Sequence, residues 1–258
     1  MKRLANLNDK QKLIDLYNTC FKGEKEFCNR FFCNVWKPEN TLLIEENGKI
    51  ISMLQMLPTV LSDGETKYSA YYIYAAATDP DFEGQGKMSC LLNESFKINR
   101  DTDYAILIVG NNSLIKFYER FGFSAAFSVS KTEIKAKNLG ITVQKTEDFE
   151  LLERIAESSL KGVFHNKRLA DDFRKNLFCS KASAYIYNDS YAILENTDKA
   201  IISETLGRDS ADLCSQLLYD KNFSSGVAVM PNGKERIGML KPIRANRPLT
   251  GYINTLFN

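Results

Sequence analysis

The stretch YIYAAATDPDFEGQGKMSCLL, residues 72–92, passes from a strand-like segment through a loop with two glycines into an apolar helical pattern. Gly84 and Gly86 allow the backbone to approach a bound group closely. The first N–H groups of a helix, together with its dipole, attract anions, and Lys87 could add a positive charge. The loop lacks the Lys-Ser/Thr ending of a P-loop and the three glycines of the dinucleotide fingerprint. We therefore expect an anion site of another class, although glycine pairs also occur in turns that bind nothing.

The composition is that of an ordinary globular protein and argues against some partners. The chain has 258 residues, 44% of them hydrophobic and 26% charged, with 34 basic and 32 acidic side chains. It therefore lacks the broad basic field of a nucleic-acid-binding protein. No apolar run reaches the roughly 18–20 residues of a membrane helix, and the N-terminus lacks the apolar segment of a signal peptide. We expect a cytoplasmic protein without nucleic-acid or membrane partners, and an oligomer remains an open option.

The cysteines and the single histidine do not indicate a metal or a nucleophilic site. The six cysteines form no CxxC pair, which argues against zinc. They lie in apolar periodic stretches, so we expect small core-filling thiols in a reducing cytosol. His165 is expected to be a surface or capping residue, because nothing near it in sequence suggests a Ser-His-Asp or Cys-His arrangement.

Hydrophobic periodicity predicts an α/β (α+β) protein with crossovers and hairpins. Helical spacing indicates four helices in the first half, at residues 9–21, 25–36, 86–98 and 111–121. Strand patterns lie between them, in a hairpin around Asn47-Gly48, at 68–78, at 104–110 and from Gly122 onward.

The second half repeats the opening of the first at a constant offset of 142 residues. Residues 167–178 align with residues 25–36, so that Phe31 corresponds to Phe173. The glycine pair has no counterpart in the second half, where only Gly207-Arg208-Asp209-Ser210 follows the matching strand. We predict two domains, residues 1–137 and a degenerate second copy, residues 138–258, that lacks the loop.

Residues 72–92 and the later stretch NNSLIKFYERFGF, residues 111–123, together resemble the GNAT superfamily of N-acetyltransferases. The family pattern Arg/Gln-x-x-Gly-x-Gly/Ala falls on Glu83, Gly86 and Met88, of which only Gly86 keeps the family residue. The second family pattern matches better, at Asn111, Leu114, Tyr118 and Gly122-Phe123. The resemblance implies the GNAT fold, a mixed central sheet flanked by helices.

The resemblance also implies acetyl-CoA as cosubstrate, no metal, and an acetyl transfer to a primary amine of a small molecule or peptide. Tyr118 would lie near the thioester sulfur as the general acid. The residues expected to bind the cosubstrate, mainly through backbone N–H groups, are Ala76, Ala77, Thr78, Gly84, Gln85, Gly86, Lys87, Met88, Ser89, Asn111 and Ser113.

The tandem layout resembles the enhanced-intracellular-survival group of acetyltransferases, in which the terminal carboxylate helps to deprotonate the amine. By that resemblance the α-carboxylate of Asn258 would act as the base. Within the chain, Glu24 and Glu26 are alternatives, although solvated helix-end charges are the simpler interpretation of both.

Two other functions stay open. A non-catalytic acyl-CoA-binding sensor with a GNAT-like fold is favoured by Glu83 and Met88, whereas Asn111 and Tyr118 argue against it. A peptidyl-ligase or leucyltransferase relative would also use duplicated GNAT units, but the near-neutral charge argues against a tRNA partner.

Overall fold

The computed structural model describes residues 1–231 and 233–253, which form two compact units. The first unit comprises Met1–Val60, Tyr68–Ala125 and Gly238–Pro248. The second comprises Leu61–Lys67, Ala126–Ile237 and the residues from Leu249 on. Each unit therefore takes residues from both halves of the sequence. The division into domains at residue 137 stays a prediction.

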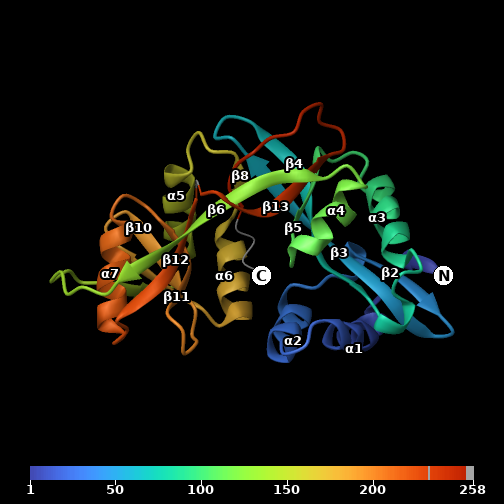
Figure 1. Cartoon of the computed structure of the whole chain (residues 1–258), viewed down its shortest axis with the longest axis horizontal. Coiled ribbons are helices and arrows are strands. Elements are labelled where there is room, and N and C mark those ends of the chain that lie inside the picture. Colours follow the sequence, from blue (N-terminus) through green and yellow to red (C-terminus); the bar gives the residue numbers. More distant parts are fainter. Residues whose placement is uncertain (232, 254–258) are drawn as a thin grey trace. The chain divides into compact units, whose positions relative to one another are not determined.

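The first unit is built on a mixed sheet with the strand order β1-β2-β3-β4-β5-β13 (Figure 1). Strands β1 to β3 pair antiparallel, β4 and β5 pair parallel, and β13 pairs antiparallel with β5. Its strands are β1 (Lys2–Leu4), β2 (Thr41–Glu46), β3 (Lys49–Ser62), β4 (Lys67–Thr78), β5 (Tyr104–Ile108) and the Gly238–Pro242 part of β13 (Glu235–Pro242). The expected mixed α/β fold is confirmed.

Helices cover both faces of this sheet. Figure 1 shows α1 and α2 on one side of β2 and β3, and α3 and α4 on the other. The helices of this unit are η1 (Leu7–Asp9), α1 (Lys10–Cys20), α2 (Lys25–Asn34), η2 (Pro38–Asn40), η3 (Pro80–Phe82), α3 (Lys87–Ile98), η4 (Asn112–Leu114) and α4 (Ile115–Glu119). Three predicted helices are confirmed within two residues at each end, and the fourth is a short 3-10 turn followed by one α-helical turn and a half.

The core between the sheet and α3 and α4 follows from alternation along the strands. Tyr71 and Ile73 of β4 point to this side, where they meet Leu91 and Leu92 of α3 and Tyr118 of α4. The intervening residues of β4 point to α1 and α2. Strand β4 is thus buried on both faces, as expected in a sheet covered on both sides.

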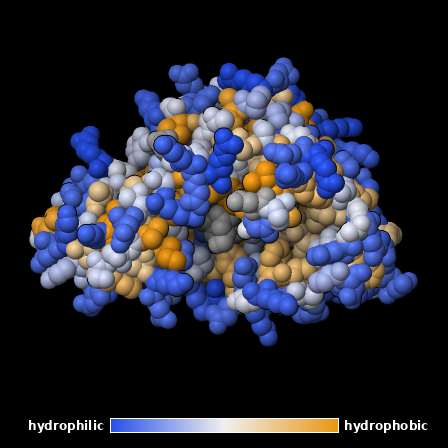
Figure 2. Space-filling view, in the orientation of Figure 1, coloured by the Kyte–Doolittle hydropathy of each residue, from blue (hydrophilic) through white to orange (hydrophobic). Residues whose placement is uncertain are grey.

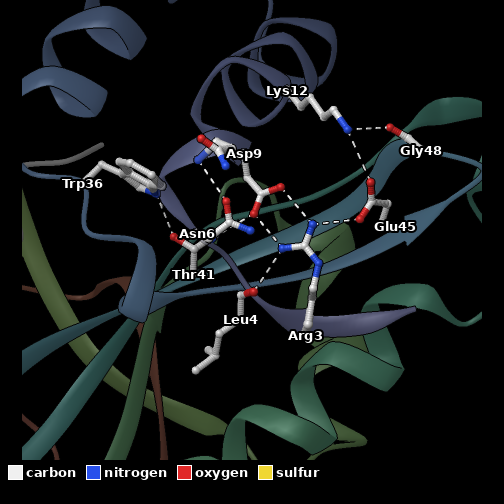
Figure 3. A network of polar contacts seen from close by, with 10 residues as sticks. Arg3, Leu4, Asn6, Asp9, Lys12, Trp36, Thr41, Glu45 and Gly48 are labelled. Carbon is white, nitrogen blue, oxygen red and sulfur yellow. Dashed lines mark hydrogen bonds and ion pairs between the residues drawn. The ribbon is translucent and has the colours of Figure 1, made fainter.

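A polar network fixes the start of the chain to α1 and β2 (Figure 3). The guanidinium of Arg3 donates two hydrogen bonds to Asp9, at 2.6 and 2.8 Å, and one to Glu45 at 2.7 Å. Asp9 also accepts from the backbone N–H of Asn6, whose side chain caps η1. Lys12 adds an ion pair to Glu45 at 3.3 Å. The network ties β1 to the helix that follows it.

The second unit has the strand order β6-β12-β11-β10-β9-β7. Helices α5 and α6 pack on one face of this sheet and α7 on the other. Its elements are β6 (Ser124–Lys135), β7 (Gln144–Thr146), α5 (Phe149–Ser159), β8 (His165–Lys167), α6 (Ala170–Ser180), β9 (Ser183–Tyr187), β10 (Ser190–Leu194), β11 (Ile201–Leu206), α7 (Ser210–Asp220) and β12 (Ser225–Pro231).

A buried ion pair lies in the second core. Arg168 and Glu204 form two hydrogen bonds at 2.6 and 2.8 Å, and both side chains are buried. The hydroxyls of Tyr191 and Tyr252 donate to the same carboxylate at 2.6 Å each. Paired and hydrogen-bonded, the buried carboxylate avoids the cost of an isolated buried charge. The network also holds Tyr252, near the end of the described chain, in the interior.

The expectation for His165 was wrong, and so was that for two of the six cysteines. His165 is buried, because its strand lies inside the second unit, and its Nδ1 is 2.7 Å from the carbonyl of Val163. Cys33 and Cys90 are exposed rather than core-filling, since they occupy the solvent faces of α2 and α3. Cys28, Cys179 and Cys214 are buried, as expected, and Cys20 is partly buried.

The distribution of hydrophilic and apolar side chains on the surface is ordinary. Figure 2 shows hydrophilic side chains over much of the visible face, with apolar residues in smaller groups between them. Among residues 1–231 and 233–253, no helix is both long enough and apolar enough to span a bilayer.

Candidate active site

The parallel strands β4 and β5 separate along their length. Within the described residues their pairing covers Ala70 to Tyr72 of β4, and Tyr72 pairs with Ile106. Strand β4 continues to Thr78, and Ala75 adopts a left-handed φ of 46°. That conformation is uncommon for a residue with a Cβ and often marks a functional position. The backbone of residues 73–78 is therefore not used in the ladder with β5.

The end of β4 is held from the side of β3 and α1. Ser52 donates to the carbonyl of Ala77 at 3.0 Å, and its Oγ is 2.9 Å from the Oγ1 of Thr78. The thiol of Cys20 donates to the carbonyl of Thr78 at 3.4 Å. Ala76 packs on the opposite side, against the core beneath α3 and α4. These contacts position the three β4 residues that the resemblance assigns to the thioester.

The glycine loop leads from β4 into α3 in the predicted way. Gly84 and Gly86 have φ values of 72° and 73°, which disfavour any residue with a side chain. No heavy atom lies within 4 Å of the place where a Cβ would stand on either glycine. Helix α3 starts at Lys87 without a side-chain cap, so the N–H groups of its first turn have no acceptor within the helix. The loop thus offers donors and open space for an anionic group.

A buried carboxylate fixes the start of this loop. Asp79 is 5% exposed, accepts from the backbone N–H of Asp81 at 3.1 Å and pairs with the ammonium of Lys49 at 2.7 Å. The hydrogen bond from Lys49 lowers the pKa of Asp79 against the effect of burial. The loop is therefore anchored to β3 by a charge pair.

Three side chains in or beside the loop do not serve directly as ligands for a phosphate group. The ammonium of Lys87 lies against the carboxylate of Glu46 in β2, so its charge is shared. Met88 packs against the core under α3 and leaves the loop itself open. Glu83 is exposed.

Asn111 and Ser113 lie together before α4. The side-chain carbonyl of Asn111 accepts hydrogen bonds from the backbone N–H of Ser113, at 3.0 Å, and from its hydroxyl. Asn111 therefore caps the turn that starts the helix. Its amide nitrogen is the part of the side chain that could donate to a ligand.

Tyr118 is the buried phenol of α4. The residue is 8% exposed, and the centroid of its ring lies 5.2 Å from that of Phe117 and 5.9 Å from that of Phe123. Burial raises the pKa of Tyr118. The phenol is therefore protonated at neutral pH and can donate a proton.

The structure adds a chain of hydroxyls that the sequence did not indicate. The Oη atoms of Tyr17 in α1 and Tyr74 in β4 are 3.0 Å apart, and Tyr17 donates to Glu24 at 2.7 Å. Glu24, an alternative base for which a solvated charge was the simpler interpretation, thus accepts a hydrogen bond from a buried hydroxyl. Alternation along β4 places Tyr74 on the α1 side, but its partner is 57 residues away in sequence.

Asn258 lies outside the described residues, so its predicted role as a base stays a prediction. Among residues 1–231 and 233–253, no group of three or more His, Cys, Asp or Glu side chains could hold a metal ion.

Residues 2–126 match the family model of the acetyltransferase (GNAT) domain. They form a GNAT acetyltransferase domain. The matched residues contain the whole site described above, from β4 to α4, and the GNAT family uses acetyl-CoA as acetyl donor. A search of curated proteins gave no match.

Solved structures share the fold of nearly the whole chain. A GCN5-related N-acetyltransferase from Anabaena variabilis has a TM-score of 0.73 at 15% identity, over 95% of this chain and 73% of that one. A probable N-acyltransferase from Enterococcus faecalis has a TM-score of 0.71 at 13% identity, over 94% and 72%. Eis1 from Mycobacterium abscessus has a TM-score of 0.69 at 13% identity, over 95% and 74%.

The geometry of the glycine loop fits acetyl-CoA, the acetyl donor of the GNAT family. Gly84 and Gly86 have a left-handed φ, and a Cβ on either would project into open space. Helix α3, which follows, begins without a side-chain cap. A diphosphate needs this kind of surface, with backbone donors and no side chain in the way.

Proposed function

We propose that this chain is an acetyl-CoA-dependent N-acetyltransferase that acts on a primary amine of a small molecule or peptide. The observation that carries the proposal is the combination, within one GNAT domain, of the glycine loop at the start of α3 with the separation of β4 from β5 after Tyr72. The loop supplies N–H donors for an anion, and beyond Tyr72 the strand supplies backbone that does not pair with β5.

The proposal gives each group a separate task. The N–H groups of residues 84–89 hold the diphosphate, Asn111 and Ser113 orient the pantetheine arm, and the backbone of residues 76–78 holds the thioester carbonyl. A backbone N–H in that position stabilises the charge that develops on the oxygen. Acetyl-CoA, when bound, supplies the acetyl thioester.

Tyr118 is proposed to donate a proton to the leaving sulfur. A free phenol has a pKa of about 10 and a thiol about 8.5, and burial raises the pKa of Tyr118 further. Its proton is therefore present throughout the neutral range, and the phenol can at least stabilise the sulfur by a hydrogen bond. At the sulfur the chain itself thus contributes a hydrogen-bond donor that is surrounded by apolar side chains.

We propose that the second unit is a degenerate copy without a cosubstrate site. Support comes from a similar element order in β7 to β12: strand, two helices, three strands, helix and strand, with the short β8 inserted between the two helices. At the matching position, a Cβ on Gly207 would stand 2.3 Å from the carbonyl oxygen of Asp189. That space is filled, whereas the space at Gly84 is open. We therefore expect one acetyl-CoA per chain.

Isothermal titration calorimetry with acetyl-CoA, followed by a thiol-release assay, tests the proposal. A panel of spermidine, tobramycin and a lysine-containing peptide covers small and peptide amines. We expect a stoichiometry near one and thiol release with at least one amine. Binding without release would support a non-catalytic sensor, a function favoured by the Lys87–Glu46 pair and by Glu83. Two equivalent sites or no binding would contradict the proposal.

One further part of the proposal concerns the compartment. The six cysteines are free thiols, which supports a reducing compartment such as the cytoplasm.

A further inference from the structure

The hydrogen-bonded chain Tyr74–Tyr17–Glu24 runs from the interior of the GNAT domain to its surface. Tyr74 is 8% exposed and Tyr17 1% exposed, whereas Glu24 is exposed to solvent. Their links are 3.0 Å between the two hydroxyls and 2.7 Å from Tyr17 to the Oε2 of Glu24. Both distances are those of ordinary hydrogen bonds.

The chain has a defined direction. An ionised carboxylate only accepts, so Tyr17 gives its hydrogen to Glu24 and must accept the hydrogen of Tyr74. With its own hydrogen committed to Tyr17, the oxygen of Tyr74 can act toward a further group only as an acceptor. Burial raises the pKa of both phenols far above that of a free tyrosine. Neither ring therefore holds a charge, and the carboxylate is the charged end of the chain.

The inner end of this chain, Tyr74, belongs to the same strand as the residues proposed to hold the thioester. Tyr74 directly precedes Ala75, whose left-handed φ turns the strand, and residues 76–78 follow. Tyr74 lies on the face of β4 that α1 and α2 cover, where its ring is 5.0 Å from that of Phe31. Tyr118 lies in the core on the opposite face. The proton acceptor Tyr74 and the proton donor Tyr118 therefore lie on opposite faces of β4.

We propose that Tyr74, Tyr17 and Glu24 form a proton relay that removes the proton from the attacking amine. The inference rests on the proposed function and adds its base. The relay acts on the ammonium before the attack. One ammonium proton goes to the oxygen of Tyr74, that of Tyr74 to Tyr17, and that of Tyr17 to Glu24, which releases it to solvent. The neutral amine then attacks. As the nitrogen–carbon bond forms and the carbon–sulfur bond breaks, nitrogen loses its second proton to solvent, sulfur takes a proton from Tyr118, and solvent reprotonates Tyr118.

The relay explains how a carboxylate as weakly basic as that of Glu24 can accept the proton of the amine. Neither phenol has to ionise, because each oxygen receives a proton as it gives one. The carboxylate attracts the proton along the chain and is itself exposed, so it is restored by water. Tyr74 is the catalytic residue, and Tyr17 and Glu24 act through it.

The first test needs no substrate. Nuclear magnetic resonance of protein labelled with 13C at the tyrosine Cζ reports the hydrogen bonding of each phenol. We expect Glu24→Gln and Tyr17→Phe to shift the Tyr74 resonance. The matched control, Glu26→Gln, changes a neighbouring carboxylate that pairs with Arg30 at 3.4 Å and should leave Tyr74 unchanged. If Glu24→Gln left the chemical shift of the Tyr74 Cζ unchanged, the relay would be overturned.

The second test is a pH profile of kcat/KM with the best amine of the panel. Tyr17→Phe keeps the ring but removes two hydrogen bonds of a buried hydroxyl, so its melting temperature should fall while its acetyl-CoA affinity should change little. We expect a loss of roughly 10²-fold at pH 7, within the range of general-base effects. The loss should shrink as pH rises toward the amine pKa of about 10.4, because the amine then deprotonates in solution. Glu24→Gln should show the same pH dependence.

Tyr71→Phe is the control for removal of a buried hydroxyl from the same strand. Tyr71 faces α3, with its Oη 3.4 Å from the Oγ of Ser95, and its loss should leave the pH profile unchanged. A loss in Tyr17→Phe that stays constant from pH 7 to 10 would indicate a structural role and overturn the proposal. Failure of every amine to react would refute the proposed function, and with it the relay, whereas the resonance test would still show whether the hydroxyls are coupled.

Discussion

The ammonium of Lys87, at the first position of α3, lies against the carboxylate of Glu46 at the end of β2. A diphosphate on the loop would compete with this carboxylate for the same cation. Glu46→Gln removes the competitor and an unfavourable negative charge, and it should tighten acetyl-CoA binding about three- to tenfold. The gain should diminish at high salt, because screening weakens such interactions.

Calorimetry of Glu46→Gln beside Glu39→Gln checks this prediction. Glu39 is an exposed carboxylate in η2, so its variant removes the same charge without touching Lys87. Equal affinities for the two variants would show that Lys87 takes no part in binding.

The glycines of the two units should respond differently to alanine. Gly84→Ala forces a left-handed φ on a residue with a Cβ, at a cost of about 1 kcal/mol in stability, but the new methyl group meets no protein atom. It should instead obstruct a bound diphosphate and weaken acetyl-CoA binding at least tenfold. Gly207→Ala meets the carbonyl of Asp189, so it should lower the melting temperature more and, in the protein that remains folded, leave the affinity unchanged.

The local parts of this site could be predicted from sequence because they depend on neighbours in the chain. The loop at Gly84 and Gly86 and helix α3 follow from a glycine turn beside an amphipathic pattern. The hairpin at Asn47-Gly48 is confirmed for the same reason, with both residues in the left-handed region.

The remaining features depend on tertiary packing that periodicity does not encode. The contact between Tyr17 and Tyr74 joins α1 to β4, and nothing in either segment specifies the other. The burial of His165 depends on the strand that carries it. The antiparallel partner of β5 is Gly238–Pro242, from the other end of the sequence. The Lys87–Glu46 pair belongs to the same class, since each residue alone reads as a solvated charge.

Tyr118→Phe should lower kcat by roughly 10²- to 10⁴-fold, the usual range for loss of an acid catalyst. The ring still packs against Phe117 and Phe123, so acetyl-CoA affinity and melting temperature should change little. Because burial raises the pKa of Tyr118, loss of its proton should not limit wild-type activity below about pH 10. Unchanged kcat in the variant would make Tyr118 a packing residue only.

The network around Arg3 should make stability depend on acidity. The hydrogen bonds from Arg3 lower the pKa of Asp9 in the folded state. Its contribution is therefore fully present above the unfolded value of about 3.9 and is lost as pH falls through the folded pKa. Asp9→Asn should cost about 2 kcal/mol at pH 7 through lost charge-assisted hydrogen bonds. Melting temperatures of both proteins from pH 7 to pH 2 should converge at the acid end, and a constant difference would contradict this account.

The first unit should fail to fold well when the chain is cut at residue 137. Gly238–Pro242 of β13 pairs with the whole of β5, from Ile108 to Tyr104, and the backbone of Arg247 accepts a hydrogen bond from the buried Tyr104 at 3.0 Å. Residues 1–137 alone would expose β5 as an unpaired, apolar edge, which favours aggregation. We expect this fragment to be poorly soluble, and addition of residues 238–248 through a flexible linker to restore a cooperative melting transition. A monomeric, cooperatively melting fragment 1–137 would show that the strand from the second half is dispensable.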